Sequence, residues 1–72
     1  MDIKEKIGKR VRELRTAKGL SQEKFSLECE LDRTYIASIE QGRRNVSIVN
    51  IEKISSACEI SVSDFFNSNL FQ

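Results

Sequence analysis

A row of polar side chains on one short segment is the part of this sequence best suited to chemistry. The residues that we expect to contact the edges of bases are Arg33, Thr34, Tyr35 and Ser38. Their side chains donate hydrogen bonds, and they include no general base next to a nucleophile. Arg33 can form two hydrogen bonds with guanine O6 and N7, and the methyl group of Thr34 can contact a thymine methyl group. The row therefore indicates a helix that reads the major groove of double-stranded DNA.

Polar and basic residues on either side of this row are suited to contacts with the DNA backbone. The predicted backbone contacts are Gln22, Arg43, Arg44, Asn45 and Ser47. Gln22 lies at the start of a predicted helix, where its amide and the free backbone N–H groups can hold a phosphate. Ser47 can cap a later helix and donate to a phosphate. For Arg43, a solvated surface position is an equally good interpretation.

The distribution of charge supports this interpretation, although the net charge of +1 does not by itself indicate nucleic acid. Residues 1–24 carry eight basic and four acidic side chains, and the loop 41–46 carries two arginines and no acid. Residues 25–40 carry one basic and four acidic side chains. Basic segments thus flank the predicted reading helix, as segments that contact the DNA backbone should. The alternative is a solvated surface of mixed charge.

Composition argues against several other classes of function. The chain has 72 residues, no histidine, and two cysteines, Cys29 and Cys58, that are too far apart for metal-ligand spacing. We therefore expect no metal, no cofactor and no catalytic residue, and hence no enzyme. Neither a signal peptide nor a membrane-spanning apolar run is visible, so we expect a cytoplasmic protein with reduced thiols. Both cysteines follow an apolar residue at helical spacing, which favours buried positions.

Apolar spacing and capping residues predict three helices in the first half of the chain. The first has an apolar stripe at helical spacing, formed by Ile3, Ile7, Val11 and Leu14. Gly19 ends this helix. Ser21 is a natural cap for a second helix at about 22–29, and Asp32 for a third at about 33–41. The short turn between them predicts a helix-turn-helix.

Two more helices are predicted in the second half. Ser47 caps the fourth, whose buried row is formed by Ile48, Ile51 and Ile54. Ser61, followed three residues later by Asp64, approximates a capping box for the fifth. Five short helices predict a compact all-α fold, with a single domain over 1–72 and the helix-turn-helix at about 21–41.

Two charged residues are expected to have a structural role. Arg15 borders the apolar stripe of the first helix, and Glu40 follows the inward-facing Ile39. We expect a buried or half-buried ion pair between Arg15 and Glu40 that orients the reading helix more than it adds stability. In the turn before that helix, Glu30 occupies a position where a left-handed conformation would cost on the order of 1 kcal/mol.

The end of the chain is crowded with large apolar side chains for so small a core. Val62 and Phe65 are expected to pack inward. The others would form an exposed apolar patch that a two-fold partner covers. We predict a dimerisation segment at about 61–72, in which the interface residues are Phe66, Leu70 and Phe71. The alternative is that the last residues fold back onto their own core.

Three short motifs resemble those of the Cro/C1-type helix-turn-helix transcription regulators, the XRE-like group. Residues 19–23, GLSQE, are similar to the start of that family's second helix, and residues 39–42, IEQG, to the end of its third. Residues 60–66 look like the start of its fifth helix. The resemblance covers about residues 5–66 and implies a five-helix, lambda-repressor-like DNA-binding domain.

Within that group, residues 31–36, LDRTYI, together with Arg44, Asn45 and Ser47, resemble the controller proteins of restriction–modification systems. This resemblance implies a homodimer that binds paired symmetric, pseudo-palindromic operators beside its own gene. It also implies that the protein activates expression at low concentration and represses at high concentration, which makes RNA polymerase a further candidate partner. Arg33 would then be the main base reader.

Other functions on the same fold remain as alternatives. A phage or plasmid repressor, or an antitoxin-like autoregulator, would use the same DNA-reading residues. A protein-interaction module would be expected to lose the arginine and glutamine at the reading positions, which this chain keeps. No ligand-binding, protease or sensor domain is visible in the sequence, so we expect the protein's concentration to set its activity, which favours autoregulation.

Overall fold

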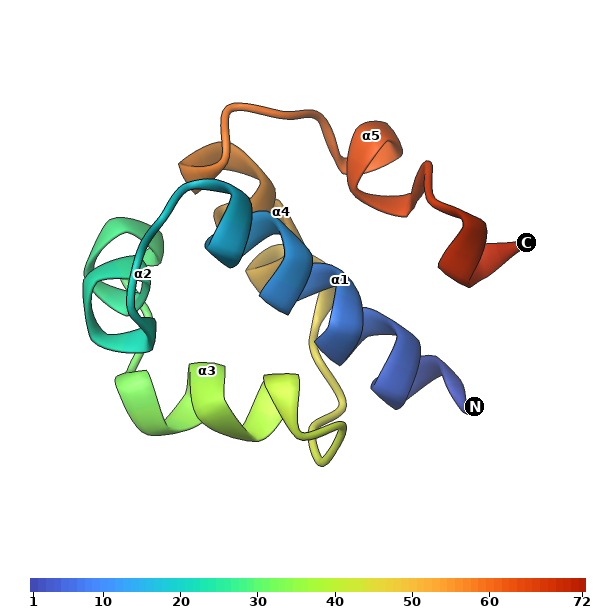
Figure 1. Ribbon diagram of the computed structural model, residues 1–72, viewed down its shortest axis with the longest axis horizontal. Coiled ribbons are helices and arrows are strands. Elements are labelled where there is room, and N and C mark those ends of the chain that lie inside the picture. The colour runs from blue at the N-terminus through green and yellow to red at the C-terminus, as the bar shows by residue number, and fades with distance from the viewer.

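Five α-helices and one short 3-10 helix make up the chain, and the computed structural model describes residues 1–72 (Figure 1). The helices are α1 (Ile3–Ala17), α2 (Gln22–Cys29), α3 (Arg33–Glu40), α4 (Ile48–Ala57), α5 (Val62–Phe66) and the 3-10 helix η1 (Asn69–Phe71). The predicted all-α fold with five helices is confirmed. In Figure 1, α3 lies along one edge of the molecule, while α1 crosses its middle.

Side-chain caps explain where the helices begin. A side-chain oxygen accepts a hydrogen bond from a backbone N–H of the first turn at each of the four predicted caps, Ser21, Asp32, Ser47 and Ser61. The first helix has a full capping box that the apolar pattern did not indicate: Glu5 N–H donates to Asp2 at 2.9 Å, and Asp2 N–H donates to Glu5 at 3.2 Å. At the fifth helix only the Ser61 half of the predicted box forms, at 3.0 Å.

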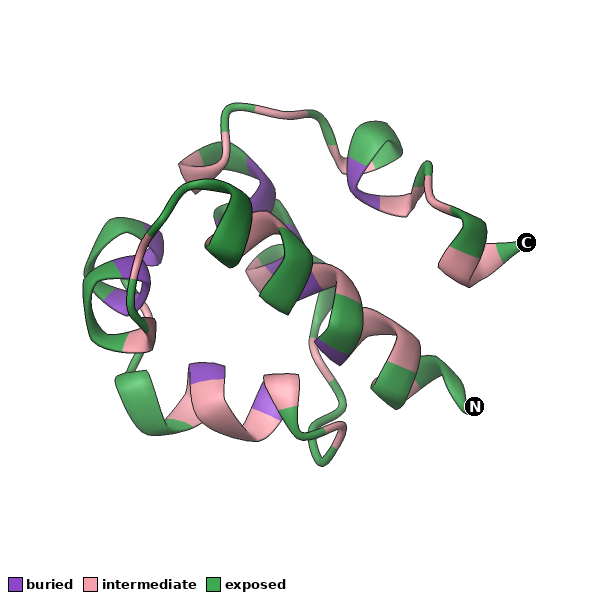
Figure 2. Cartoon of the chain, in the orientation of Figure 1, coloured by how far each residue is buried: buried purple, intermediate pink, exposed green.

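The core contains apolar side chains from all five α-helices, and Figure 2 shows the buried residues on the inward faces of α2 and α3. Its members are Val11, Phe25, Cys29, Ile36, Ile39, Ile51, Ile54 and Phe65. Two isoleucines of the predicted apolar rows are exposed. Ile3 is 55% exposed and Ile48 is 63% exposed, and each is the first residue of its helix.

The two cysteines are free thiols, one buried and one half-buried. Burial raises the pKa of Cys29 to about 12, and burial also raises the pKa of Cys58. At neutral pH both thiols are therefore protonated. Cys29 is a core residue, whereas Cys58, at the end of α4, is less covered than the sequence predicts.

The aromatic side chains near the end of the chain fold back onto the core. Phe65 is fully buried, and the rings of Phe66 and Phe71 meet edge to face with their centroids 5.0 Å apart. Phe66, Leu70 and Phe71 are half-buried rather than fully exposed. The three side chains thus lie partly at the surface, with the two aromatic rings packed against each other, and their place in a dimer interface stays a prediction.

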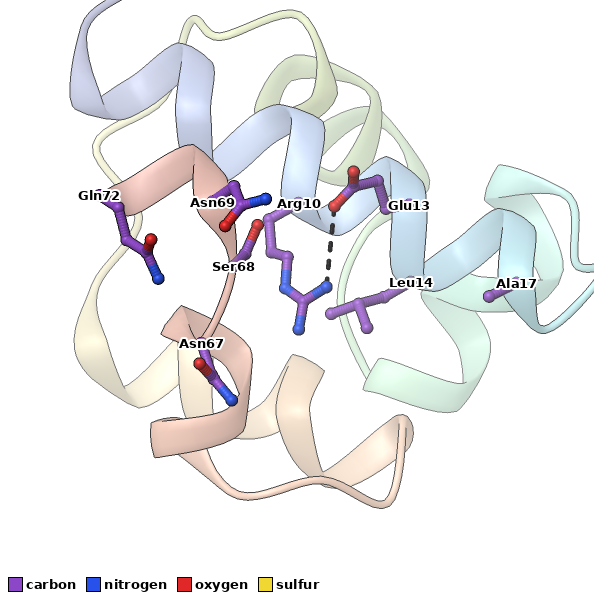
Figure 3. A pocket seen from close by; sticks show the side chains of 8 residues that line it. All are labelled: Arg10, Glu13, Leu14, Ala17, Asn67, Ser68, Asn69 and Gln72. Atoms are coloured by element: carbon purple, nitrogen blue, oxygen red, sulfur yellow. Dashed lines mark ion pairs between the residues drawn. The ribbon is translucent and has the colours of Figure 1, made fainter.

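Arg10 joins this C-terminal part to α1. Its Nε donates to the carbonyl oxygen of Phe65 at 2.7 Å, and its Nη2 donates to that of Asp64 at 2.8 Å. Figure 3 shows Arg10 and Glu13 in a cleft between α1 and residues 67–72. Arg10 is the only basic residue that lines the cleft, and its guanidinium already binds two carbonyl groups and lies 3.7 Å from Glu13. The Arg10 side chain, which lines the cleft on α1, thus connects this helix to the C-terminal part of the chain.

The backbones of α1 and α3 come into close contact at Gly8. This residue is buried, and a Cβ atom built on it would collide with the carbonyl oxygen of Ile39 and lie 3.1 Å from that of Glu40. Just beyond α3, Gly42 has φ +74°, and a Cβ atom there would lie 2.9 Å from Cγ of Glu5. Only glycine permits this approach, which holds the end of α3 against α1.

Replacing Gly8 by alanine tests this contact, because the close approach reverses the sign of the expected change in the free energy of unfolding. In an exposed helix the substitution would add about 0.5–1 kcal/mol of stability. Here we expect a loss of about 1–3 kcal/mol in the free energy of unfolding, because the methyl group has no space. Urea unfolding followed by circular dichroism measures it, with the exposed neighbour Lys9→Ala as the control. A Gly8→Ala variant more stable than the wild type would contradict the close approach.

Candidate nucleic-acid interface

A three-residue turn sets the angle between α2 and α3. Glu30 ends α2 in the left-handed conformation, with φ 58° and ψ 40°, as its position in the sequence indicated. The next N–H group, that of Leu31, donates to the carbonyl oxygen of Ser26 at 3.0 Å, which closes the end of α2. Leu31 packs against the core and Asp32 caps α3. The turn is therefore anchored on both sides.

The carboxylate of Glu40, at the end of α3, links this helix to α1 and α2. Arg15 donates from Nε to Glu40 Oε2 at 2.7 Å and from Nη2 to Oε1 at 2.9 Å, so the expected ion pair is bidentate. The Glu40 side chain is only 5% exposed. The hydrogen bond to Glu40 raises the pKa of Arg15. A third Arg15 donor, Nη1, reaches the carbonyl oxygen of Leu20 at 2.9 Å.

Gln22 takes part in the same network. Its Nε2 donates to Glu40 Oε1 at 3.2 Å, and the residue is half-buried at the start of α2. The ion pair thus holds the glutamine amide in one orientation. A phosphate contact by Gln22 stays a prediction, with its side-chain donor already directed to Glu40.

The outer face of α3 begins with two residues whose side chains are free. Arg33 and Thr34 are exposed, and the Arg33 guanidinium makes no hydrogen bond or ion pair within the chain. Ser38 differs, because its hydroxyl donates to the carbonyl oxygen of Thr34 at 2.9 Å. Ser38 therefore offers an acceptor, rather than a donor, to a base edge. Arg33 is the one unengaged cation on the helix.

Tyr35, on α3, contacts both α4 and the loop that joins the two helices. Its hydroxyl accepts a hydrogen bond from Asn50 Nδ2 at 3.0 Å, and Arg44 Cζ lies 5.3 Å from the centroid of its ring. Asn50 was not a candidate from sequence, since an asparagine in the first turn of a helix is common. Only the three-dimensional contact identifies it.

The predicted backbone contacts after α3 are exposed. Arg43, Arg44 and Asn45 form the loop before α4, and Ser47 Oγ caps α4 by accepting from a backbone N–H at 3.1 Å. The eight residues of α3 extend about 12 Å. Arg33 and the two loop arginines thus lie at opposite ends of this helix, which places positive charge on both sides of its outer face.

The structure contains neither a metal site nor a membrane span. No three His, Cys, Asp or Glu side chains converge to hold a metal ion. None of the helices has both the length and the apolar composition needed to cross a membrane.

Two helices joined by a tight turn, with the second exposing an arginine at its start, define a helix-turn-helix domain. The helix-turn-helix family matches residues 11–65, and the chain belongs to this family. Among its relatives, the control protein C.MunI from a Mycoplasma species is 51% identical over 67 residues, which cover 92% of this chain and 90% of that protein.

Solved structures of controller proteins have the same fold. The restriction–modification controller C.AhdI from Aeromonas hydrophila is 51% identical, with a TM-score of 0.82 over 88% of this chain and 91% of its own. The controller C.Esp1396I, solved as a tetramer with its natural 35-base-pair operator, is 35% identical, with a TM-score of 0.83 over 92% of this chain and 87% of its own.

Removing the shared carboxylate should destabilise the domain. Glu40→Ala leaves the largely buried Arg15 guanidinium without its anion, so we expect a loss of about 3 kcal/mol. The double variant Arg15→Met/Glu40→Leu removes both charges and keeps the volume, and it should be more stable than Glu40→Ala. Urea unfolding compares the two proteins. A double variant less stable than Glu40→Ala would show that the pair contributes more than mutual neutralisation.

Proposed function

We propose that this chain is a sequence-specific DNA-binding transcription regulator and the controller of a restriction–modification system. The observation that carries the proposal is the exposed, unpartnered Arg33 at the start of α3. In a recognition helix, the residues at the N-terminal end are the ones that contact bases. The controller relatives at 51% identity support the finer assignment. The chain presents no constellation of a nucleophile and a base, so we propose no catalytic role.

The proposed interface divides its residues between bases and backbone. Arg33 binds a guanine edge, with Thr34, Tyr35 and Ser38 beside it. The phosphate contacts come from the start of α2 and the loop after α3, through Gln22, Arg43, Arg44, Asn45 and Ser47. The two sets predict different consequences of mutation, since only base contacts carry sequence information.

Selection from a random duplex-DNA library at physiological salt tests the function. We expect enrichment of a two-fold symmetric site with half-sites about ten base pairs apart. Arg33→Ala should lose the preference at one base position of each half-site, a discrimination of about 1–3 kcal/mol. Arg44→Ala should weaken all sites alike and reduce the salt slope by about one unit. If folded wild-type protein enriches no sequence, the chain is a protein-interaction module instead.

The proposed active form is a homodimer. One helix-turn-helix makes few contacts, and two reading helices about 34 Å apart match successive major grooves. The relative C.Esp1396I is a tetramer on its operator. Besides the half-buried Phe66, Leu70 and Phe71, the surface includes Ile48 and Val49, which are 63% and 60% exposed at the start of α4. We propose that both sets face the partner.

Charged substitutions separate the two parts of this surface. Ile48→Glu/Val49→Glu places acids in the first turn of α4, where the helix dipole tolerates them. Leu70→Glu places an acid in the C-terminal segment. We expect either variant to sediment as a monomer at concentrations where the wild type is a dimer. Two variants that both remain dimeric would place the interface elsewhere, and a monomeric wild type would contradict the homodimer.

The controller assignment also includes autoregulation, with RNA polymerase as a second partner. Transcription in vitro from the DNA upstream of the chain's own gene tests both. Activation at low protein concentration followed by repression at high concentration is the expected result. Repression alone would favour a phage or plasmid repressor, or an antitoxin-like autoregulator.

A further inference from the structure

Asn50 joins the reading helix to α4. Its Nδ2 donates to the Tyr35 hydroxyl at 3.0 Å, which is the only side-chain hydrogen bond between α3 and α4. The backbone of Asn50 is itself fixed, because its N–H donates to Ser47 Oγ at 3.1 Å. A donor on an anchored piece of backbone thus sets the position of the tyrosine hydroxyl. The hydroxyl proton remains free to donate to DNA.

The Tyr35 ring in turn contacts the guanidinium of Arg44. The guanidinium carbon lies 5.3 Å from the ring centroid, within the range of a cation–π contact. No backbone N–H of residues 44–46 forms a hydrogen bond within the chain, so the loop itself does little to fix this arginine. A free arginine side chain loses rotamer freedom when it binds a ligand. An aromatic surface that already holds it reduces that loss.

We propose that Asn50 is a positioning residue for DNA recognition, which acts through the Tyr35 hydroxyl to fix the ring that holds the Arg44 guanidinium beside α3. This inference rests on the proposed DNA-binding function and adds to it a residue that does not touch DNA. It also gives Tyr35 two tasks: its ring holds Arg44, and its hydroxyl proton stays available to the operator.

A measurement without DNA tests the first step. The chain contains one tyrosine and no tryptophan, so tyrosine fluorescence reports on Tyr35 alone. We expect Asn50→Ala and Arg44→Ala each to increase the quenching of this fluorescence by acrylamide, because the ring loses the guanidinium that covers it. Asn67→Ala, which changes an exposed asparagine after α5, is the matched control and should leave quenching unchanged. Unchanged quenching in Asn50→Ala overturns the proposal.

Binding to the selected operator tests the second step. Asn50→Ala should lower affinity about three- to ten-fold, the change expected from one hydrogen bond, and Asn67→Ala should not. Asn50→Leu removes the same donor, keeps the volume of the side chain and leaves the Tyr35 hydroxyl in place, so it decides the question if Asn50→Ala fails to fold. Circular dichroism establishes folding in each case.

A double-mutant cycle identifies the route. If Asn50 acts through Arg44, the variant Asn50→Ala/Arg44→Ala binds as Arg44→Ala alone does. Losses that add in full overturn the proposal, since Asn50 would then affect binding by a route that does not include Arg44. If the wild type selects no DNA sequence, the proposed function fails, and the quenching experiment still decides whether Asn50 holds the tyrosine.

Discussion

The contact between α1 and the end of α3 is the constraint on which the interface depends. A helix of eight residues is not stable by itself in water, so its orientation must come from its neighbours. At Gly8 the two backbones meet with no side chain between them. About two turns further along α1, Arg15 binds Glu40 with two hydrogen bonds. One steric and one ionic contact together fix both the position of α3 and its rotation.

The arginines of the chain fall into groups that follow from this framework. Arg10 and Arg15 bind carbonyl or carboxylate groups of their own chain and hold helices together. Arg33 has no such partner, and Arg44 has only an aromatic ring. Because Arg10 and Arg15 are engaged within the chain, they are not available to a ligand, whereas Arg33 and Arg44 are exposed at the start and beyond the end of α3. The folded contacts, as well as the position in the sequence, therefore determine which arginines can bind DNA.

Local features of the sequence predicted most of the fold, because caps and turns depend on neighbouring residues. Ser21, Asp32 and the left-handed Glu30 lie where the sequence indicated. Side-chain burial at helix ends was less predictable: Ile48 has apolar spacing, yet nothing covers the first residue of its helix. The candidate interface shows the same division: the exposed position of Arg33 at the start of α3 could be predicted from the sequence, whereas the hydrogen bond from Asn50 to a tyrosine fifteen residues away required the folded chain.

The left-handed residues Glu30 and Glu59 have a consequence for the lifetime of the protein. Both have φ 58°, and each costs about 1 kcal/mol relative to a residue without a Cβ atom. In a domain of this size, such costs are a large share of a small total stability and raise the fraction of unfolded chains that proteases can reach. If concentration alone sets activity, faster degradation makes the level of the regulator follow changes in its synthesis more closely. The two left-handed residues would then help to set how long transcription continues to depend on protein made earlier.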